Sequence, residues 1–214
     1  MEIIELLKKG LAELGLAPSG EQIHAFMTYL SELKKWSRAY NLTGIKKDED
    51  IIIKHFLDSL LYLKAFPAGE MRVADIGSGA GFPGIPLKII RPDMGMYLIE
   101  PSGKKSAFLR HIIRHLKLRN IEVIEQRIED IRVNEEISSP VDVAVTRALY
   151  DSREFINKAS HIVRQGGTLV LSKGPKVKEE INTLTDVTYE LLIVSLPLSE
   201  IKRHLVVVTL NDWS

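Results

Sequence analysis

A run of closely spaced glycines constrains the fold of this chain more than any other feature. It follows an apolar segment in the stretch VADIGSGAGFPGIP. Three of the glycines fit the pattern D-x-G-x-G-x-G from Asp75 to Gly81, and a segment with helical character, Ile85–Ile90, comes next. Glycine adopts positive φ angles easily and lets a ligand approach the backbone closely. A strand, a bare loop and a helix in this order are typical of the ligand-binding turn in a doubly wound α/β sheet.

From residue 72 onward, segments with strand character alternate with amphipathic segments. The expected strands are Arg72–Ile76, Met96–Glu100, Ile121–Glu125, Val141–Val145, Thr168–Ser172, Leu191–Ser195 and His204–Leu210. The expected helices are Gly84–Ile90, Gly103–Leu118, Ser152–Arg164 and Lys176–Leu184. This order predicts an α/β fold with a doubly wound, seven-stranded, mostly parallel sheet. The last two strands have no helix between them, so we expect them to pair as an antiparallel hairpin.

The first part of the chain shows only helical periodicity. Apolar residues recur at helical spacing in two segments, and a third helix is expected at Asp48–Leu63. Ser19 is a candidate N-cap for the second helix. The stretch Phe66–Glu70 contains proline and glycine and is the best candidate for a boundary. We therefore expect an N-terminal helical extension at residues 1–66 and the α/β domain at residues 67–214.

Composition excludes several classes of chemistry. The chain has 214 residues, of which 45% are hydrophobic and none is cysteine, so disulfides, thiolate metal sites and cysteine nucleophiles are absent. His111 and His115 lie four residues apart without a glutamate between them, and we expect no metal there. The first residues indicate an amphipathic helix rather than a signal peptide, and no apolar run approaches the ~18 residues of a membrane span. We expect a cytoplasmic monomer with no membrane, disulfide or metal partner.

The glycine loop does not fit a dinucleotide site. The fingerprint G-x-G-x-x-G that starts at Gly77 and Gly79 would need glycine where Phe82 stands, which disfavours a dehydrogenase. The spacing instead resembles the cofactor loop of class I S-adenosylmethionine methyltransferases. Glu100, at the end of the next expected strand, can accept hydrogen bonds from both ribose hydroxyls and would repel a 2′-phosphate. We expect Asp75, Gly77, Gly79 and Glu100 to bind the cofactor.

A cluster of positive charge follows the second expected strand, in a span without aspartate or glutamate. Its members, here called the basic ridge, are Lys104, Lys105, Arg110, Arg114, Lys117 and Arg119. Apolar residues on the same segment supply a buried stripe, so the positive side chains share an outer face. Such a face is often merely solvated, but it also suits a phosphate backbone. Arg110 and Arg114 are therefore candidate RNA contacts.

Several longer motifs occur in a fixed order along the chain. They are YNLTGI (Tyr40–Ile45), KHFLDSL (Lys54–Leu60), DIGSGAGFPGIPLKI (Asp75–Ile89), GKKSAFL (Gly103–Leu109), VTRAL (Val145–Leu149), SKG (Ser172–Gly174) and RHLVV (Arg203–Val207). From about residue 40 to the end, the chain resembles the ribosomal RNA small subunit methyltransferase G family. The resemblance implies a class I, Rossmann-like fold and N7-methylation of one guanine in the 530 loop of 16S rRNA. It also implies S-adenosylmethionine as cofactor and 16S rRNA or the small ribosomal subunit as partner.

The resemblance also assigns site residues. The family's cofactor contacts fall on Gly77, Phe82, Ile128, Glu129 and Arg147. The family often has a small residue where this chain has Ile128, which narrows the adenine pocket unless the contact runs through the backbone. Relatives carry Asp in place of Glu100 in some cases, with the same charge and a shorter reach.

The chemistry needs few catalytic groups. Guanine N7 has an in-plane lone pair and no proton, so it attacks a sulfonium methyl group without a general base. Positioning then carries most of the catalysis. Arg147 is the candidate catalytic residue. The paired N–H donors of its guanidinium suit guanine, phosphate or the cofactor carboxylate. Lys173, at the end of the fifth expected strand, is assigned to an RNA phosphate.

Five residues stay undecided between an interdomain hydrogen-bond cluster and a cap over the pocket. They are Asn41, His55, Asp58, Arg203 and His204. Two other functions also stay open at this point. A small-molecule methyltransferase is compatible with the short N-terminal extension, although the basic ridge argues against it. A non-catalytic RNA-binding protein on the same fold is compatible with the ridge, although the intact glycine loop argues against it.

Overall fold

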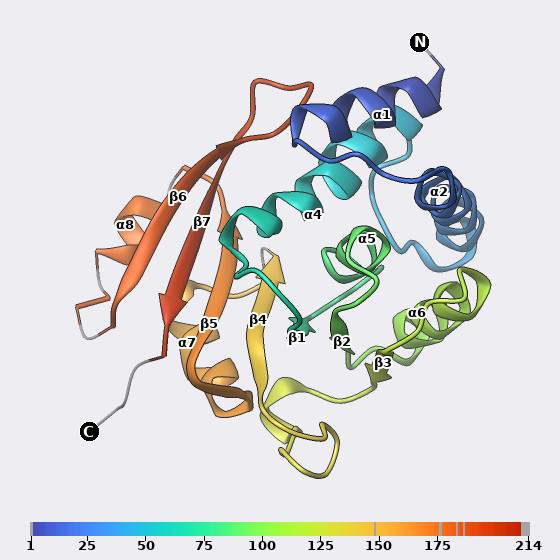
Figure 1. Cartoon of the computed structure of the whole chain (residues 1–214). Helices are drawn as coiled ribbons and strands as arrows, with labels where there is room; N and C mark the ends of the chain where they lie inside the picture. Colours follow the sequence, from blue (N-terminus) through green and yellow to red (C-terminus); the bar gives the residue numbers. More distant parts are fainter. Residues whose placement is uncertain (1, 148, 176, 183, 186, 211–214) are drawn as a thin grey trace.

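A central sheet with helices on both faces forms the body of the protein (Figure 1). The structure is a computed structural model, and it describes residues 2–147, 149–175, 177–182, 184–185 and 187–210. The strands are β1 (Arg72–Ile76), β2 (Gly95–Ile99), β3 (Ile121–Ile124), β4 (Val141–Arg147), β5 (Val163–Lys173), β6 (Tyr189–Ser195) and β7 (Lys202–Thr209). Their order in the sheet is β3-β2-β1-β4-β5-β7-β6. The first five strands run parallel, while β7 is antiparallel to both β5 and β6. The seven-stranded, mostly parallel sheet and its antiparallel end are confirmed.

The helices after β1 differ from the expected ones mainly at their ends. They are α5 (Gly84–Ile90), α6 (Gly103–His115), α7 (Ser152–Ala159) and α8 (Val177–Ile181). The expected helix Ser152–Arg164 is wrong in its last turn, where a 3-10 turn, η4 (Ser160–Ile162), leads into β5. Val163 pairs with Val141 of β4. Val163 is β-branched and therefore favours the strand over another turn of helix. Lys176, the expected start of the last helix, lies outside the described residues.

The secondary-structure elements of the N-terminal part are helical, as the periodicity predicts. It contains α1 (Ile3–Glu13), α2 (Gly20–Tyr40), α3 (Asp48–Ile51), the π-helical turn η1 (Ile52–Leu57), α4 (Asp58–Leu60) and the 3-10 turn η2 (Leu61–Ala65). Ser19 caps α2, since its hydroxyl accepts the backbone N–H of Gln22 at 3.2 Å and the Gln22 side chain accepts the N–H of Ser19 at 2.8 Å. The expected helix Asp48–Leu63 is a run of four short pieces, and its π-helical turn is a geometry often found at functional sites.

The sheet has one apolar layer on each face. Val73 and Leu98 point to the layer that contains α1, α2, α5 and α6, whereas the alternate residues Ala74 and Ile99 point to the layer with α7 and α8. Figure 1 shows these two groups of helices on opposite sides of the sheet. This alternation is the period of two that any strand imposes.

Two buried tyrosines tie the N-terminal helices to the functional edge of the sheet. The hydroxyl of Tyr29 in α2 donates to the carbonyl of Ala80 in the glycine loop. The hydroxyl of Tyr62 in η2 donates to the carbonyl of Thr146 near the end of β4. Burial raises the pKa of both phenols, so both stay neutral donors. The N-terminal helices therefore support the glycine loop and the end of β4 directly.

Neither a membrane-crossing helix nor a metal cluster occurs among the described residues. Their helices are too short or too polar to span a bilayer. Within the same residues, no three His, Cys, Asp or Glu side chains are placed to hold a metal ion together.

Candidate functional site

Residues at the carboxyl ends of β1, β2 and β3 line one pocket of about 400 Å³, here called the glycine-loop pocket. Of the predicted cofactor contacts, Gly77, Glu100, Ile128 and Glu129 line it together. The carboxyl edge of a parallel sheet is where ligands bind in this architecture, and the volume lies in the range of small-molecule sites.

The glycine loop turns sharply after β1. The backbone N–H groups of Gly77 and Ser78 both donate to the carbonyl of Ile99, at 2.9 and 3.1 Å. Gly77 has a φ of 73°, a conformation that side chains other than glycine rarely adopt. A Cβ there would collide with the side chain of Leu149, which is 52% exposed and covers the pocket side of the loop. The position thus requires glycine for both its conformation and its surroundings.

Glu100 is fixed in place by two backbone groups. One carboxylate oxygen accepts the N–H of Gly79 and the other accepts the N–H of Ser102, both at 2.9 Å. The residue is only 4% exposed, and Lys105 lies 4.0 Å from it. Each carboxylate oxygen can accept a second hydrogen bond. The carboxylate is therefore preorganised as an acceptor for a diol in the pocket.

The remaining wall of the glycine-loop pocket combines apolar and charged groups. Ile128 is buried and follows β3, while the carboxylate of Glu129 pairs with the ammonium of Lys158 in α7. The hydrogen bond from Lys158 lowers the pKa of the Glu129 carboxyl. The Lys158 ammonium also lies 5.7 Å from the ring centre of Tyr150. The pocket therefore has an apolar wall beside a neutralised ion pair.

Asp75 lies under the glycine loop and is absent from the lining of its pocket. It is fully buried, and one carboxylate oxygen accepts the N–H of Gly84 at 2.9 Å. The other oxygen has no hydrogen-bond partner among the described residues. Burial raises the pKa of this carboxyl to about 7. Asp75 thus connects the start of the loop to the first turn of α5.

A second cavity of about 420 Å³ lies at the ends of β4 and β5, here called the Arg147 pocket. It is lined by Ile45, Lys54, His55, Asp58, Arg147, Ser172, Lys173, Gly174 and Arg203. Arg147 therefore lines this cavity, not the glycine-loop pocket. Three of the undecided residues, His55, Asp58 and Arg203, gather around it.

Arg147 is held by several partners at once. Its guanidinium lies 3.1 Å from Nδ1 of His55, 3.3 Å from the carbonyl of Lys54 and 3.7 Å from a carboxylate oxygen of Asp58. It also lies 5.1 Å from the ring centre of Phe82. The side chain retains 19% exposure, so part of the guanidinium faces the cavity with its orientation fixed.

His55 is a neutral link in this cluster. Burial and the charge of Arg147 lower the pKa of His55 to about 3. Since Arg147 can only donate, Nδ1 accepts, and the proton resides on Nε2, which donates to Oγ1 of Thr43 at 2.8 Å. The ring stacks on Phe82 with centroids 4.5 Å apart. Phe82 is thus a buried support beneath Arg147 and His55.

Lys173 lies between the two pockets. Its ammonium donates to the carbonyl of Tyr150 and lies 3.3 Å from Glu180, and its side chain is 15% exposed. Tyr150 lines the glycine-loop pocket and Lys173 lines the Arg147 pocket. One hydrogen bond therefore joins the walls of the two cavities.

Of the basic ridge, only Lys105 lines one of the two pockets, the glycine-loop pocket. Arg110 forms an ion pair of 2.6 Å with Glu125 at the end of β3, and Arg114 is exposed. Between them, His111 lies 2.6 Å from Glu32 of α2. Carboxylates from neighbouring elements thus reduce the positive charge of the ridge.

Several lining residues of the glycine-loop pocket were not predicted as cofactor contacts, among them Lys105, Arg127, Leu149, Tyr150 and Lys158. Leu149 ends the VTRAL motif, so a signal for it was present in the chain; Ala148 of that motif lies outside the described residues. Lys158 gave no local signal, because its partner Glu129 lies 29 residues away.

The sheet order and the pocket beside the glycine loop define a class I methyltransferase fold. A methyltransferase from Pyrococcus furiosus matches 87% of this chain and 98% of its own, with a TM-score of 0.58 and 13% identity. The structure of M. jannaschii TYW2 in complex with AdoMet matches 72% of this chain and 74% of its own, with a TM-score of 0.54 and 17% identity. These two similarities show the fold alone.

Sequence comparison is more specific. A family profile described as rRNA small subunit methyltransferase G matches residues 22–206. Ribosomal RNA small subunit methyltransferase G of Caldanaerobacter subterraneus subsp. tengcongensis is 38% identical over 98% of this chain and 90% of its own. That of Geobacter sp. (strain M21) is 40% identical over 85% of this chain and 82% of its own. The chain belongs to the rRNA small subunit methyltransferase G family, which confirms the resemblance.

Proposed function

We propose that the protein transfers a methyl group from S-adenosylmethionine to N7 of a guanine in the 530 loop of 16S rRNA. The observation that carries the proposal is the glycine-loop pocket, whose lining combines Gly77 with Glu100, a carboxylate fixed by the backbone N–H of Gly79. Family membership supports the RNA substrate. It does not favour a small-molecule methyltransferase or a non-catalytic RNA-binding protein.

The residues of the glycine-loop pocket fit the proposed cofactor. Glu100 retains acceptor capacity for the two ribose hydroxyls, and Ile128 offers an apolar surface for the adenine. Gly77 supplies the positive φ that the turn needs, and Asp75 and Gly79 support the loop through their hydrogen bonds. When bound, S-adenosylmethionine supplies a methyl group on a positively charged sulfur. Glu129, beside Ile128 on the same wall, completes the proposed adenine end of the site.

The Arg147 pocket is the proposed site for the target base. His55 cannot take a proton there, because Nδ1 accepts from Arg147 and Nε2 carries the proton that Thr43 accepts. Asp58, the carboxylate in the same lining, is paired with Arg147 and Arg203. This arrangement suits N7, whose lone pair needs no deprotonation. The chain then mainly aligns nucleophile and methyl group, a contribution of roughly 7–11 kcal/mol in favourable cases.

We assign Arg147 to the substrate side. Its guanidinium faces the pocket at the end of β4 and is held by His55 and Asp58 in a fixed orientation, which suits a fork of donors for guanine or its phosphate. Phe82 positions this guanidinium from below. Lys173 is assigned to the neighbouring phosphate, and its link to Tyr150 places it between both cavities.

The wider arrangement follows from this assignment. Residues 1–66 serve as an extension that supports the site, and residues 67–214 carry the cofactor and the reaction. Arg110 and Arg114 are proposed as outer phosphate contacts. The substrate is 16S rRNA or the small ribosomal subunit, and a cytoplasmic monomer suffices for the reaction.

A labelled-methyl assay tests the function. The purified protein, S-adenosylmethionine and small-subunit RNA that lacks the modification are incubated, and the nucleosides are separated and weighed by mass spectrometry. We expect 7-methylguanosine in the 530 loop, on naked RNA or on isolated subunits. Binding of the cofactor without methylation of either substrate would refute the proposed function.

A further inference from the structure

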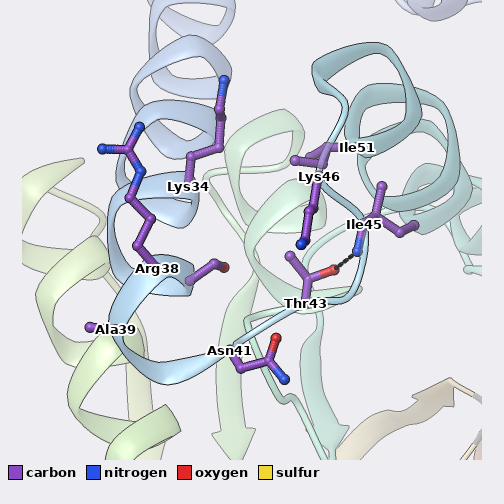
Figure 2. Close-up of a pocket in the computed structure, with 9 residues that line it drawn as sticks. Lys34, Arg38, Ala39, Asn41, Thr43, Ile45, Lys46 and Ile51 are labelled. Atoms are coloured by element: carbon purple, nitrogen blue, oxygen red, sulfur yellow. Dashed lines mark hydrogen bonds between the residues drawn. The ribbon is translucent and has the colours of Figure 1, made fainter.

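One cavity of the described residues has no role in the site above. It has a volume of about 470 Å³ and lies between the C-terminal half of α2 and the loop that follows it. Figure 2 shows its two walls: Lys34 and Arg38 extend from α2, while Thr43, Ile45 and Lys46 come from the loop. We call it the α2-loop pocket.

The charge of the α2-loop pocket has one sign. Lys34, Arg38 and Lys46 line it, and none of its lining residues is acidic. Lys34 is neutralised by Asp48 at 2.5 Å. Neither Arg38 nor Lys46 has an ion-pair or hydrogen-bond partner in the part of the chain that the structure describes. Two uncompensated cations at one cavity favour an anionic ligand.

Two hydroxyl groups in the same lining have a proton to donate. The Oγ of Ser37 is buried and has no hydrogen-bond partner among the described residues. Oγ1 of Thr43 accepts the backbone N–H of Ile45 at 3.2 Å and the Nε2–H of His55 at 2.8 Å; Figure 2 draws the first of these bonds. With both lone pairs used, its own proton remains for an acceptor.

The α2-loop pocket adjoins the Arg147 pocket. Ile45 lines both cavities. Thr43, on one wall, is joined through His55 to Arg147, on the other. A polynucleotide with its target base at Arg147 carries phosphates on either side of that base, so a neighbouring phosphate lies within reach of this cavity.

We propose that the α2-loop pocket binds a phosphate of the RNA strand next to the target nucleotide, through Arg38, Lys46 and the hydroxyls of Ser37 and Thr43. This inference rests on the proposed RNA substrate and adds a second contact point for it. The N-terminal extension then holds the strand itself, besides supporting the glycine loop. The volume leaves room for the sugar attached to that phosphate.

A double variant tests the inference in the full chain. In Arg38→Gln/Lys46→Gln, binding of an RNA fragment with the 530 loop is measured by fluorescence anisotropy at several salt concentrations. Loss of two phosphate contacts makes the slope of log affinity against log salt less steep by about 1.4, since each single-strand contact contributes ~0.7. The matched control, Lys9→Gln/Lys202→Gln, removes two exposed charges elsewhere and keeps the native slope.

Further measurements distinguish failure of this inference from failure of the proposed function. Calorimetric affinity for S-adenosylmethionine and the circular dichroism of the double variant are expected to equal those of the native protein, while its KM for RNA rises. Arg38→Lys/Lys46→Arg keeps both charges and restores the slope. A double variant with the native slope and KM would overturn this inference and leave the function intact. A native protein that binds no RNA would overturn the proposed function itself.

Discussion

Arg203 and Asp58 form a two-pronged ion pair across 145 residues of sequence, with Nε and Nη2 of the arginine 2.7 and 3.2 Å from the two carboxylate oxygens. Asp58 starts α4 in the N-terminal helices, whereas Arg203 lies on β7. The same carboxylate lies 3.7 Å from Arg147, and its side chain is only 3% exposed. One buried carboxylate thus holds two arginines at the edge of the Arg147 pocket.

Removal of this carboxylate is expected to destabilise the protein. Asp58→Asn leaves two arginines without their counter-charge, and breaking a buried pair in this way costs about 3–5 kcal/mol. Both arginines are partly exposed, so we expect a loss below that range, about 2–3 kcal/mol, in urea unfolding. The control Glu135→Gln breaks an exposed pair with Arg132 and should change the unfolding free energy by less than ~1 kcal/mol. Equal losses in both variants would contradict the buried role of Asp58.

The Asp58–Arg203 pair also shows where prediction from sequence ends. The succession of strands along the chain, the glycine turn and the position of Glu100 follow from local patterns, because a strand end and a loop are neighbours in sequence. No local pattern pairs residues that meet only when β7 inserts between β5 and β6. Likewise, the span of the basic ridge contains no acidic residue, yet Glu125, directly after β3, forms an ion pair with Arg110.

Substitution of the first loop glycine is expected to abolish cofactor binding. Gly77→Val places a β-branched residue at a φ of 73° and drives its side chain against Leu149. In calorimetric titration with S-adenosylmethionine, we expect at least a tenfold loss of affinity with the circular dichroism spectrum unchanged. Gly20→Ala is the control, since a Cβ there meets only open space. Native affinity in Gly77→Val would rule out the glycine loop as the cofactor site.

Glu100→Gln tests whether the carboxylate after β2 accepts hydrogen bonds from the ribose of the cofactor. Both carboxylate oxygens accept backbone N–H groups, from Gly79 and Ser102, so a glutamine must turn its NH₂ group toward one of these donors. A hydrogen bond to a charged group contributes about 1.5–3 kcal/mol, and we expect a 10- to 100-fold loss of affinity for S-adenosylmethionine. Glu122→Gln, on the exposed side of β3, is the matched control. An affinity within twofold of native would show that Glu100 does not contact the ribose.

His55 makes the stability of the protein depend on pH. Its pKa in the folded protein is about 3, against an ordinary value of about 6.5 in the unfolded chain. The unfolded state therefore binds the extra proton first, and stability falls as pH falls from about 6.5 toward 3, at up to ~1.4 kcal/mol per pH unit.

Unfolding in urea at pH 6.5 and pH 5 measures this loss. The native protein is expected to lose up to about 2 kcal/mol between the two pH values. His55→Gln, which cannot titrate, should be less stable at pH 6.5, because it lacks the stack on Phe82, but should lose less on acidification. His24→Gln, an exposed position in α2, should keep the native pH dependence. If His55→Gln lost as much stability as the native protein between the two pH values, the acid sensitivity would lie in other groups, and His55 would not be the neutral link between Thr43 and Arg147.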